Sequence, residues 1–395
     1  MKMVIKAPLA NLRRLTGANF LMVEHGAAAD VALDDLDKNA KTELWQKSTR
    51  ELLDAVGWTD SKIAVRSFDG GVTLQVSAPT DALHSGMSLV EAAWDYTNSI
   101  LAKIPFDLNG VVKDLKKQIC DEHSPLEVSL AVRAKGLGLT YLGHDDKISI
   151  GLGVGGAVYD VTNLPSADDV EWGKLHDIPI AMVTGTNGKS TTVRLAAAIG
   201  QAAGHCVGLS SSDWVRVGGE ILDEGDYSGP AGARLAVRDP RVDLGIIETA
   251  RGGLMRRGLP VPTADVCLLT NIAADHLGTY GIMDVCALAD AKFQISQAVK
   301  PNGWLVLNAD DPELVTRSSD FSGQLSWFGL DFSAVNLQEL IAKGGRAAFL
   351  QNDFMMLAKD GEVSQVMHVN DFVPALKGAA KFNVYNALGA IALTD

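Results

Sequence analysis

A glycine-rich loop between an apolar run and a helical pattern constrains the fold of this chain more than any other feature. Residues 184–192 read Thr-Gly-Thr-Asn-Gly-Lys-Ser-Thr-Thr, after the apolar run Ile178–Val183 and before an alanine-rich stretch that ends at Ala203. This order predicts a strand, a tight loop and a helix. At such a helix start, backbone N–H groups bind phosphate oxygens, Lys189 neutralises the terminal phosphates and the Ser190 hydroxyl holds Mg²⁺. ATP or GTP is therefore the first ligand to consider.

The loop is shorter than the common phosphate loop. Two residues, Thr186 and Asn187, separate Gly185 from Gly188, whereas the common motif has four residues between its first glycine and the Gly-Lys pair. We expect the N–H groups of residues 186–189 to surround the phosphates. A glycine turn capped by Thr186 or Asn187 is the structural alternative.

The composition is ordinary for a globular protein and excludes several classes of function. At 395 residues the chain has room for two or three domains. Its formal net charge of −13 argues against a protein that mainly coats nucleic acid or an anionic membrane. It has neither an apolar run near the roughly 18 residues of a spanning helix nor a signal-peptide core, so we expect a cytoplasmic protein. The cysteines match no zinc or disulfide spacing and are expected to be reduced; they are Cys120, Cys206, Cys267 and Cys286.

From about residue 176 onward, short apolar runs alternate with helical patterns, which is typical of a parallel sheet covered by helices. The expected strands are Ile178–Val183, His205–Leu209, Asp243–Glu248, Asp265–Thr270 and Trp304–Asn308. One expected helix begins after Lys189, and two others span Ala231–Arg238 and Val285–Val299. The predicted fold class is therefore α/β, with a P-loop-type, mostly parallel sheet and flanking helices over residues 176–395.

Residues 1–170 have a different pattern and predict a separate mixed α/β domain. Strand-like pieces occur at Phe20–Glu24, Ile63–Phe68, Val72–Val76 and Ile148–Gly151, and helical segments at Lys41–Val56, Ser88–Ile104 and Pro125–Lys135. A polar linker over residues 164–177 marks the boundary. The run Gly151–Gly156 resembles a dinucleotide fingerprint, but no helical pattern follows it, so a glycine-rich turn between strands is the better interpretation.

The C-terminal part predicts short strands and a final helix. The strands are expected at Leu325–Gly329, Ala347–Leu350, Phe354–Ala358 and Glu362–Val369, with Asp360-Gly361 as a hairpin turn. A helix that begins near Asn383 is still running at Asp395. We therefore expect this sequence to be a fragment of a longer protein.

Polar residues follow two of the expected strands where a phosphate-transfer site needs them. Glu248 ends one strand, where an acidic residue can hold Mg²⁺. The next strand leads into Asn271 and then Asp275 and His276, and Lys292 lies in the helix that follows. Each has a plainer explanation, namely a surface glutamate, an Asp-His helix cap or a solvated lysine. Because they occur at successive strand ends beside the glycine loop, we favour one shared site.

In their order along the chain, these motifs resemble the Mur ligase family of ATP-dependent ligases that form amide bonds. The matching stretches are Gly185–Ser190, the Glu248 strand, Asn271–His276 and Asn383-Val-Tyr-Asn386. The resemblance is most specific to the Mur-type half of cyanophycin synthetase, through Gly225–Arg234, Arg238–Asp243, Glu248–Gly253 and Asp275–Gly278. Arg13–Asn19 and Glu122–Leu126 are similar to the N-terminal region of that enzyme. Its ATP-grasp domain has no counterpart, because only about 20 residues separate Gly156 from the Mur-like part.

The resemblance implies a mechanism and a set of site residues. A substrate carboxylate attacks the γ-phosphate of ATP to give an acyl phosphate, and an amine then displaces phosphate. The implied catalytic residues are Lys189, His276 and Lys292, the last as the candidate for a carbamylated lysine. The implied ATP-binding residues are Gly185, Thr186, Asn187, Gly188, Lys189, Ser190, Thr191, Asn271, Asn383 and Asn386, and the implied Mg²⁺ ligands are Ser190, Glu248 and His276. Arg234 and Arg251 are candidates for holding substrate carboxylates, with structural ion pairs as the alternative.

The implied partners are a small-molecule or peptide carboxylate and an amino-acid amine, with neither nucleic acid nor membrane. Mur ligases carry a third domain that closes over ATP. We therefore expect either a longer gene product, or a homo-oligomer or partner subunit that supplies this domain. Two other interpretations stay open: a poly-γ-glutamate synthetase-like ligase and a non-catalytic ATP-binding subunit.

Overall fold

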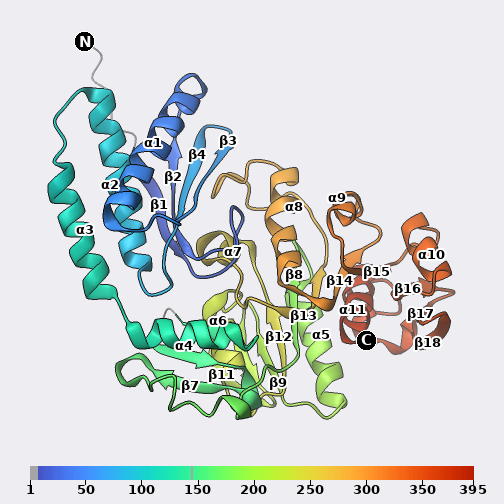
Figure 1. The fold of residues 1–395 in the computed structure, drawn as a ribbon. Helices are drawn as coiled ribbons and strands as arrows, with labels where there is room; N and C mark the ends of the chain where they lie inside the picture. Colours follow the sequence, from blue (N-terminus) through green and yellow to red (C-terminus); the bar gives the residue numbers. More distant parts are fainter. Residues whose placement is uncertain (1–7, 144–145) are drawn as a thin grey trace.

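The computed structural model of the protein describes residues 8–143 and 146–395. Three sheets organise these residues: a 4-stranded sheet near the N-terminus, a 3-stranded sheet, and an 11-stranded sheet. In Figure 1 the two smaller sheets lie at the end of the molecule opposite the C-terminal strands. The glycine loop belongs to the largest sheet.

The 11-stranded sheet is mostly parallel. Its strand order is β11-β10-β9-β12-β8-β13-β14-β15-β16-β17-β18, and the strands from β9 to β16 in this order run parallel. The strands are β8 (Ile180–Thr184), β9 (Val207–Ser210), β10 (Trp214–Val217), β11 (Glu220–Glu224), β12 (Leu244–Glu248), β13 (Ala264–Leu269), β14 (Val299–Asn308), β15 (Gln324–Gly329), β16 (Ala347–Gln351), β17 (Phe354–Lys359) and β18 (Glu362–His368). The predicted α/β class is confirmed.

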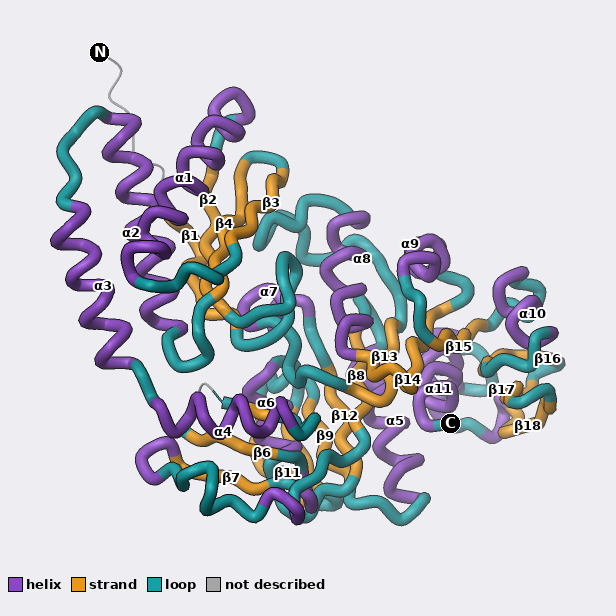
Figure 2. The backbone as a smooth tube through the Cα atoms, viewed as in Figure 1, coloured by secondary structure: helices purple, strands orange, loops and turns teal. Residues whose placement is uncertain are grey.

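Helices cover both faces of this sheet (Figure 2). The side chains of β8 alternate between two apolar clusters, Ile180 and Met182 in one and Ala181 and Val183 in the other, because successive residues of a strand point to opposite faces. One face carries α5 (Lys189–Ala202) and α11 (Lys381–Thr394), which pack against each other. The other face carries α6 (Pro230–Val237), α7 (Arg251–Arg257), α9 (Pro312–Arg317) and α10 (Val335–Ala342), with α8 (Val285–Phe293) beside α7 and α9.

The N-terminal sheet is antiparallel, in the order β1-β2-β4-β3. Its elements are β1 (Leu9–Leu15), β2 (Gly26–Ala32), α1 (Asp35–Val56), β3 (Ile63–Phe68), β4 (Gly71–Ser77), α2 (Leu83–Ala102) and α3 (Leu108–Glu122). The buried rings of Trp45 and Trp94 fill the core between this sheet and its helices. This unit therefore has an apolar core of its own.

The 3-stranded sheet follows the N-terminal unit along the chain and lies beside the strands β9 and β11 of the large sheet (Figure 1). It consists of β5 (Tyr141–Leu142), β6 (Lys147–Ile150) and β7 (Ala157–Asp160), with α4 (Pro125–Gly136) packed on it. The predicted glycine turn is confirmed, since a short 3₁₀ helix at Gly153–Gly155 joins β6 to β7. Val154 donates its N–H to the Val242 carbonyl at 2.8 Å, which fastens this sheet to the large-sheet unit. The predicted domain 1–170 thus holds two separate sheets, and its boundary at 164–177 stays a prediction.

Two local predictions are wrong. Phe20–Glu24 is a turn and not a strand, because the Asn19 side-chain oxygen accepts hydrogen bonds from the N–H groups of Leu21 and Met22 at 3.1 and 3.3 Å. The helix predicted over Val285–Val299 ends earlier, since α8 gives way to a 3₁₀ helix at Gln294–Ala298 and then to β14. No helix within residues 8–143 and 146–395 is both long and apolar enough to cross a membrane. All four cysteines are free.

Candidate nucleotide-binding and active site

The glycine loop connects β8 to α5 as predicted, and two of its positions admit only glycine. Gly185 has φ +141°, and a Cβ there would lie 1.9 Å from Thr270 Oγ1. Gly188 has φ +83°, and a Cβ there would lie 2.1 Å from Asn386 Oδ1. The loop therefore passes closer to its neighbours than any residue with a side chain allows.

Asn271, which follows β13, holds the loop in place. Its carbonyl accepts the Thr186 N–H at 2.8 Å, and its side chain accepts the Asn187 N–H and donates to the Asn187 carbonyl, each at 3.0 Å. The expectation that the N–H groups of Thr186 and Asn187 cradle phosphate is therefore corrected, because both already donate to Asn271. The first N–H groups of α5, at residues 189–191, lack acceptors within the helix and are the ones available to a phosphate.

Ser190 and Glu248 meet where α5 begins and β12 ends. The Glu248 side chain is buried, and its carboxylate accepts a hydrogen bond from the Ser212 N–H at 3.2 Å, while the Ser190 hydroxyl lies 2.9 Å from the Ser212 hydroxyl and is near enough to Glu248 to affect its pKa. Burial raises the pKa of Glu248, while the Ser190 hydroxyl and the Lys189 charge oppose that rise. A hydroxyl and a carboxylate side by side are oxygen ligands of the kind that Mg²⁺ takes, so these two residues fit a divalent ion.

Two lysines that are far apart in the sequence, Lys189 and Lys292, both contact the glycine loop. The Lys189 ammonium donates to the Thr186 carbonyl at 3.0 Å. Lys292, on α8, is only 4% exposed, and its Nζ donates to the Gly185 carbonyl at 2.7 Å. Burial, together with the charges of Lys189 and Arg251, lowers the pKa of Lys292 from 10.5 to about 7. The predicted Lys292 is thus brought to the loop, with an amine that is partly neutral near pH 7.

His276 lies on the loop that follows β13. Its side chain is 78% exposed, and its Nε2 lies 3.6 Å from Asp275 Oδ1. Among the residues that the structure describes, no three His, Cys, Asp or Glu side chains gather as metal ligands. His276 as a Mg²⁺ ligand stays a prediction. Arg251 contacts the same loop, since its Nη2 donates to Thr279 Oγ1 at 2.7 Å.

A pocket of about 600 Å³ opens beside the glycine loop. From the predicted set it is lined by Asn187, Gly188, Thr191, Asn271 and Asn386; its other lining residues are Asn308, Asp310, Asp311, Pro312, Phe382 and Tyr385. Asn386 is buried over Gly188, whereas Asn383 donates its Nδ2 to the Pro374 carbonyl at 2.7 Å and does not line the pocket. The exposed Phe382 ring offers a flat face on which an aromatic base can stack. The pocket therefore fits a nucleotide whose phosphates point to α5.

Asn308, Asp310 and Asp311 are pocket residues that the sequence analysis missed. Asn308 ends β14, and Asp310 and Asp311 follow it, at the same sheet edge as Glu248 and Asn271, so the strand-end argument would have found them. Asn308 Nδ2 donates to the Thr270 carbonyl at 2.9 Å, and the Asp311 carboxylate accepts the Ile272 N–H at 2.6 Å. These residues position the segment that clamps the glycine loop.

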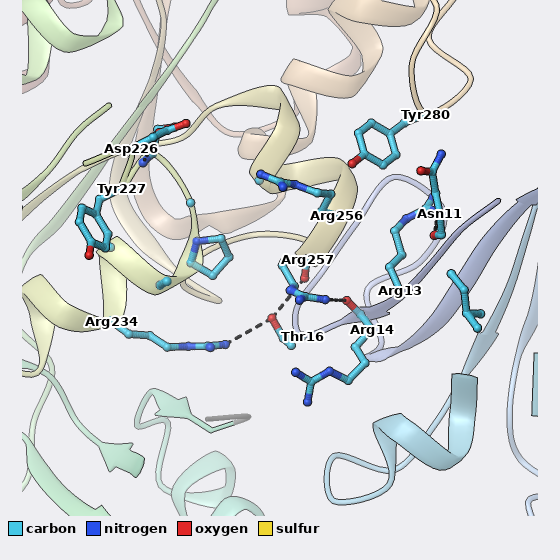
Figure 3. A pocket seen from close by; sticks show the side chains of 17 residues that line it. Asn11, Arg13, Arg14, Thr16, Asp226, Tyr227, Arg234, Arg256, Arg257 and Tyr280 are labelled. Atoms are coloured by element: carbon cyan, nitrogen blue, oxygen red, sulfur yellow. Dashed lines mark hydrogen bonds between the residues drawn. The ribbon is translucent and has the colours of Figure 1, made fainter. Parts of the chain in front are cut away.

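Arg234 lies elsewhere, in a pocket between the N-terminal sheet and the large sheet (Figure 3). Its Nη2 donates to Thr16 Oγ1 at 3.3 Å. The structure thus separates the two candidate substrate arginines: Arg251 contacts Thr279 in the loop that follows β13, and Arg234 lies in this second pocket.

A shortened phosphate loop on a mostly parallel sheet, with a buried carboxylate at the end of the neighbouring strand, defines a nucleotide-binding α/β protein of the P-loop type. Residues 183–394, more than half of the chain, match the Mur ligase middle domain. The chain belongs to the Mur ligase family, whose members are ATP-dependent ligases. The resemblance inferred from the motifs is confirmed.

Curated relatives share the central part of the chain. Cyanophycin synthetase from Nostoc sp. is 36% identical over 213 residues, which cover 54% of this chain and 24% of that enzyme. UDP-N-acetylmuramoylalanine–D-glutamate ligase from Chlorobium luteolum is 31% identical over 220 residues, which cover 54% of this chain and 42% of that enzyme. A solved structure of UDP-N-acetylmuramoyl-L-alanyl-D-glutamate–2,6-diaminopimelate ligase matches with a TM-score of 0.41 and 17% identity over 55% of this chain and 43% of that chain. The chain therefore matches less than half the length of each of these relatives.

Proposed function

We propose that this protein is an ATP-dependent, ADP-forming ligase that joins a carboxylate to an amino acid or another amine through an amide bond. One observation supports the proposal above all others: the Lys189 ammonium, the buried Glu248 carboxylate and the buried Lys292 amine lie within electrostatic reach of one another around the loop. A structural role for the loop alone gives no reason to bury a carboxylate and a second lysine against it.

The proposed reaction has two steps. A carboxylate oxygen attacks the γ-phosphorus of ATP, the bond to the bridging oxygen of ADP breaks, and an acyl phosphate forms. An amine nitrogen then attacks the acyl carbon, inorganic phosphate leaves and the nitrogen loses a proton. The first step brings two anions together, so Lys189 and the N–H groups at the start of α5 would offset the charge. Ser190 and Glu248 would hold Mg²⁺, which neutralises the β- and γ-phosphates when it is bound.

Lys292 has the properties of a lysine that becomes carbamylated. Its partly neutral amine can add to CO₂ with loss of a proton, which places a carboxylate-like group beneath Gly185. Such a group would stand opposite Lys189 and Arg251, the two cations whose charges lower the pKa of Lys292. We propose it, with His276, as the holder of a second divalent ion near the incoming carboxylate.

The substrate pair is proposed from similarity to cyanophycin synthetase. An aspartyl or peptide carboxylate with a basic amino acid is the first pair to test, and glutamyl carboxylates with glutamate form the second. Similarity of fold transfers the chemistry of acyl activation better than it transfers the identity of the substrates.

ADP release tests the proposal directly. Purified protein is incubated with ATP, Mg²⁺ and each pair of carboxylate and amino acid, and ADP is measured with each partner alone and with both. ADP release should rise only with a matched pair and should fall by about 100-fold or more in Lys189→Ala. Lys343→Ala, which changes an exposed lysine after α10, should keep the wild-type rate. ATP binding without any substrate-stimulated ADP release, also in the full-length gene product, would instead identify a non-catalytic ATP-binding subunit.

A further inference from the structure

A second pocket, of about 440 Å³, lies between β1 of the N-terminal unit and the helices α6 and α7 of the large-sheet unit. Arginines from three elements line it: Arg13 and Arg14 from β1, Arg234 from α6, and Arg256 and Arg257 from α7. Asp226 is the one acidic residue among its lining residues. Figure 3 shows the side chains of Arg14, Arg234 and Arg257 around Thr16. In a chain with a net charge of −13, this concentration of guanidinium groups needs an explanation.

Arg13 has internal partners on both units. It forms an ion pair with the buried Asp30 at 3.2 Å, and its Nε–H donates to the Met255 carbonyl at 2.9 Å. Arg13 therefore links the N-terminal unit to the large-sheet unit. Arg14, Arg256 and Arg257 form no ion pair with any residue in the described part of the chain. Burial and the positive charges of Arg14 and Arg256 lower the pKa of Arg257. These three cations thus stand close together without a counter-ion.

The helix dipole does not account for this cluster. Arginines in the last turn of a helix interact favourably with its carbonyl end, which is sufficient reason for Arg256 and Arg257 on α7. Arg234 likewise lies in the last turn of its own helix, α6, but Arg14 lies on a strand, and no single helix dipole gathers these side chains into one pocket. Guanidinium groups that converge from three elements are instead the arrangement that binds carboxylate or phosphate groups through paired hydrogen bonds.

The walls of the pocket are joined by backbone hydrogen bonds. The Thr16 N–H donates to the Arg257 carbonyl at 2.7 Å, and the Leu259 N–H donates to the Ala18 carbonyl at 2.7 Å. A Cβ at Gly17 would lie 2.7 Å from the Leu259 carbonyl oxygen, so these two segments of the chain are in close contact there. The arginines of β1 and α7 are therefore held in a fixed relation before any ligand binds.

The pocket is also within reach of the proposed reaction site. Helix α7 begins three residues after Glu248, and its seven residues span about 10 Å along the helix axis. Arg251 is at the end near the glycine loop, and Arg257 is at the end in the pocket. An extended peptide covers about 10 Å with three residues.

We propose that this arginine pocket binds the distal end of the carboxylate substrate, a molecule that carries two or more carboxylate or phosphate groups about 10 Å from the carboxylate that is activated. The identification of the ligand as the substrate rests on the proposed function, whereas the anion site does not. The pocket thus selects acidic, multiply charged acceptors over simple amino acids.

Calorimetric titration in the absence of nucleotide tests the site. The carboxylate probe is tetra-aspartate. The phosphate probe is inorganic tripolyphosphate, titrated into Lys189→Ala protein so that the glycine loop does not compete. Arg256→Gln is the main variant, because within the described part of the chain the Arg256 side chain donates its hydrogen bond to the Gly252 carbonyl of its own helix, so we expect the fold to tolerate its loss. It should weaken binding of the preferred probe by about tenfold or more, as should Arg14→Gln. Arg133→Gln, which removes an exposed arginine from α4, should stay within about twofold of wild type.

Each outcome has a defined meaning. Arginine-dependent binding of tetra-aspartate identifies a polycarboxylate end, and arginine-dependent binding of tripolyphosphate alone identifies a phosphorylated end; both support the site. Binding of neither probe, or equal binding by Arg256→Gln and wild type, would overturn it. Intact pocket binding in a protein that never releases ADP with any substrate pair would refute the ligase proposal and leave the anion site standing.

Discussion

Replacing Lys292 by methionine should change how the stability of the protein depends on pH. The pKa of Lys292 is about 7 in the native state, against roughly 10.4 in an unfolded chain. Between these values the unfolded state binds a proton that the native state does not, so the free energy of unfolding rises with pH. For these two pKa values, burial of Lys292 costs roughly 4 kcal/mol at pH 7 and roughly 2 kcal/mol at pH 9. The wild-type protein should therefore gain about 2 kcal/mol over this range through Lys292 alone.

Equilibrium urea unfolding at pH 7 and pH 9 measures this gain. The buffers must be free of CO₂, because a carbamate would replace the titrating amine. The difference in free energy of unfolding between Lys292→Met and wild type should shrink by about 2 kcal/mol from pH 7 to pH 9. Lys343→Met, which changes a lysine whose side chain is 75% exposed, should show no such change. A difference for Lys292→Met that is the same at both pH values would refute the reasoning, since Lys292 would then carry its proton in the native state as well.

Two further predictions concern the glycine loop. Gly188→Ala should lower the free energy of unfolding by about 1–3 kcal/mol and weaken ATP binding, because it adds a Cβ 2.1 Å from Asn386 Oδ1 at φ +83°. In urea unfolding, adding Asn386→Ala should restore only the part of the lost free energy that is due to that contact. Full recovery would contradict the argument from the positive φ. Asn271→Ala removes two hydrogen bonds to Asn187, each of about 1 kcal/mol, and should raise the Kd for ATP by about 5- to 30-fold. Titration of ATP into this variant and into Asn163→Ala, an exposed control, measures the effect, and an unchanged Kd would show that Asn271 does not order the loop.

The parallel core was predictable because its strands are buried on both faces. β8, β12 and β13 read as continuous apolar runs, and their polar ends then fall at one sheet edge whatever the details of packing. That reasoning located Lys189, Glu248 and Asn271 correctly relative to one another. It did not show that Asn271 takes up the N–H groups of Thr186 and Asn187, because a side-chain clamp depends on where two loops meet.

Of the N-terminal strands, β3 and β4 were predicted, whereas β2 was missed because it lacks the usual signal. β2 reads Gly-Ala-Ala-Ala-Asp-Val-Ala, with a single β-branched residue, yet its face is buried against α2. Small side chains are favoured there by close helix packing, as at Gly86, where a Cβ would lie 3.0 Å from the Cβ of Ala78 and 3.4 Å from that of Ala27. Packing of this kind is decided by the partner element and leaves no periodic pattern in the strand itself.

The arginine pocket, like β2, could not be predicted from the sequence. Arg13 and Arg14, Arg234, and Arg256 and Arg257 belong to three stretches that are far apart in sequence, and each stretch alone is explained by an ordinary ion pair or helix cap. Only the contact of β1 with α7 brings them together, and that contact depends on Gly17 and on the carbonyl of Arg257 accepting the Thr16 N–H. Charge gathered by such a contact weakens the contact unless a ligand of opposite charge binds to it. A substitution at Gly17 should accordingly weaken anion binding even though it removes no charge.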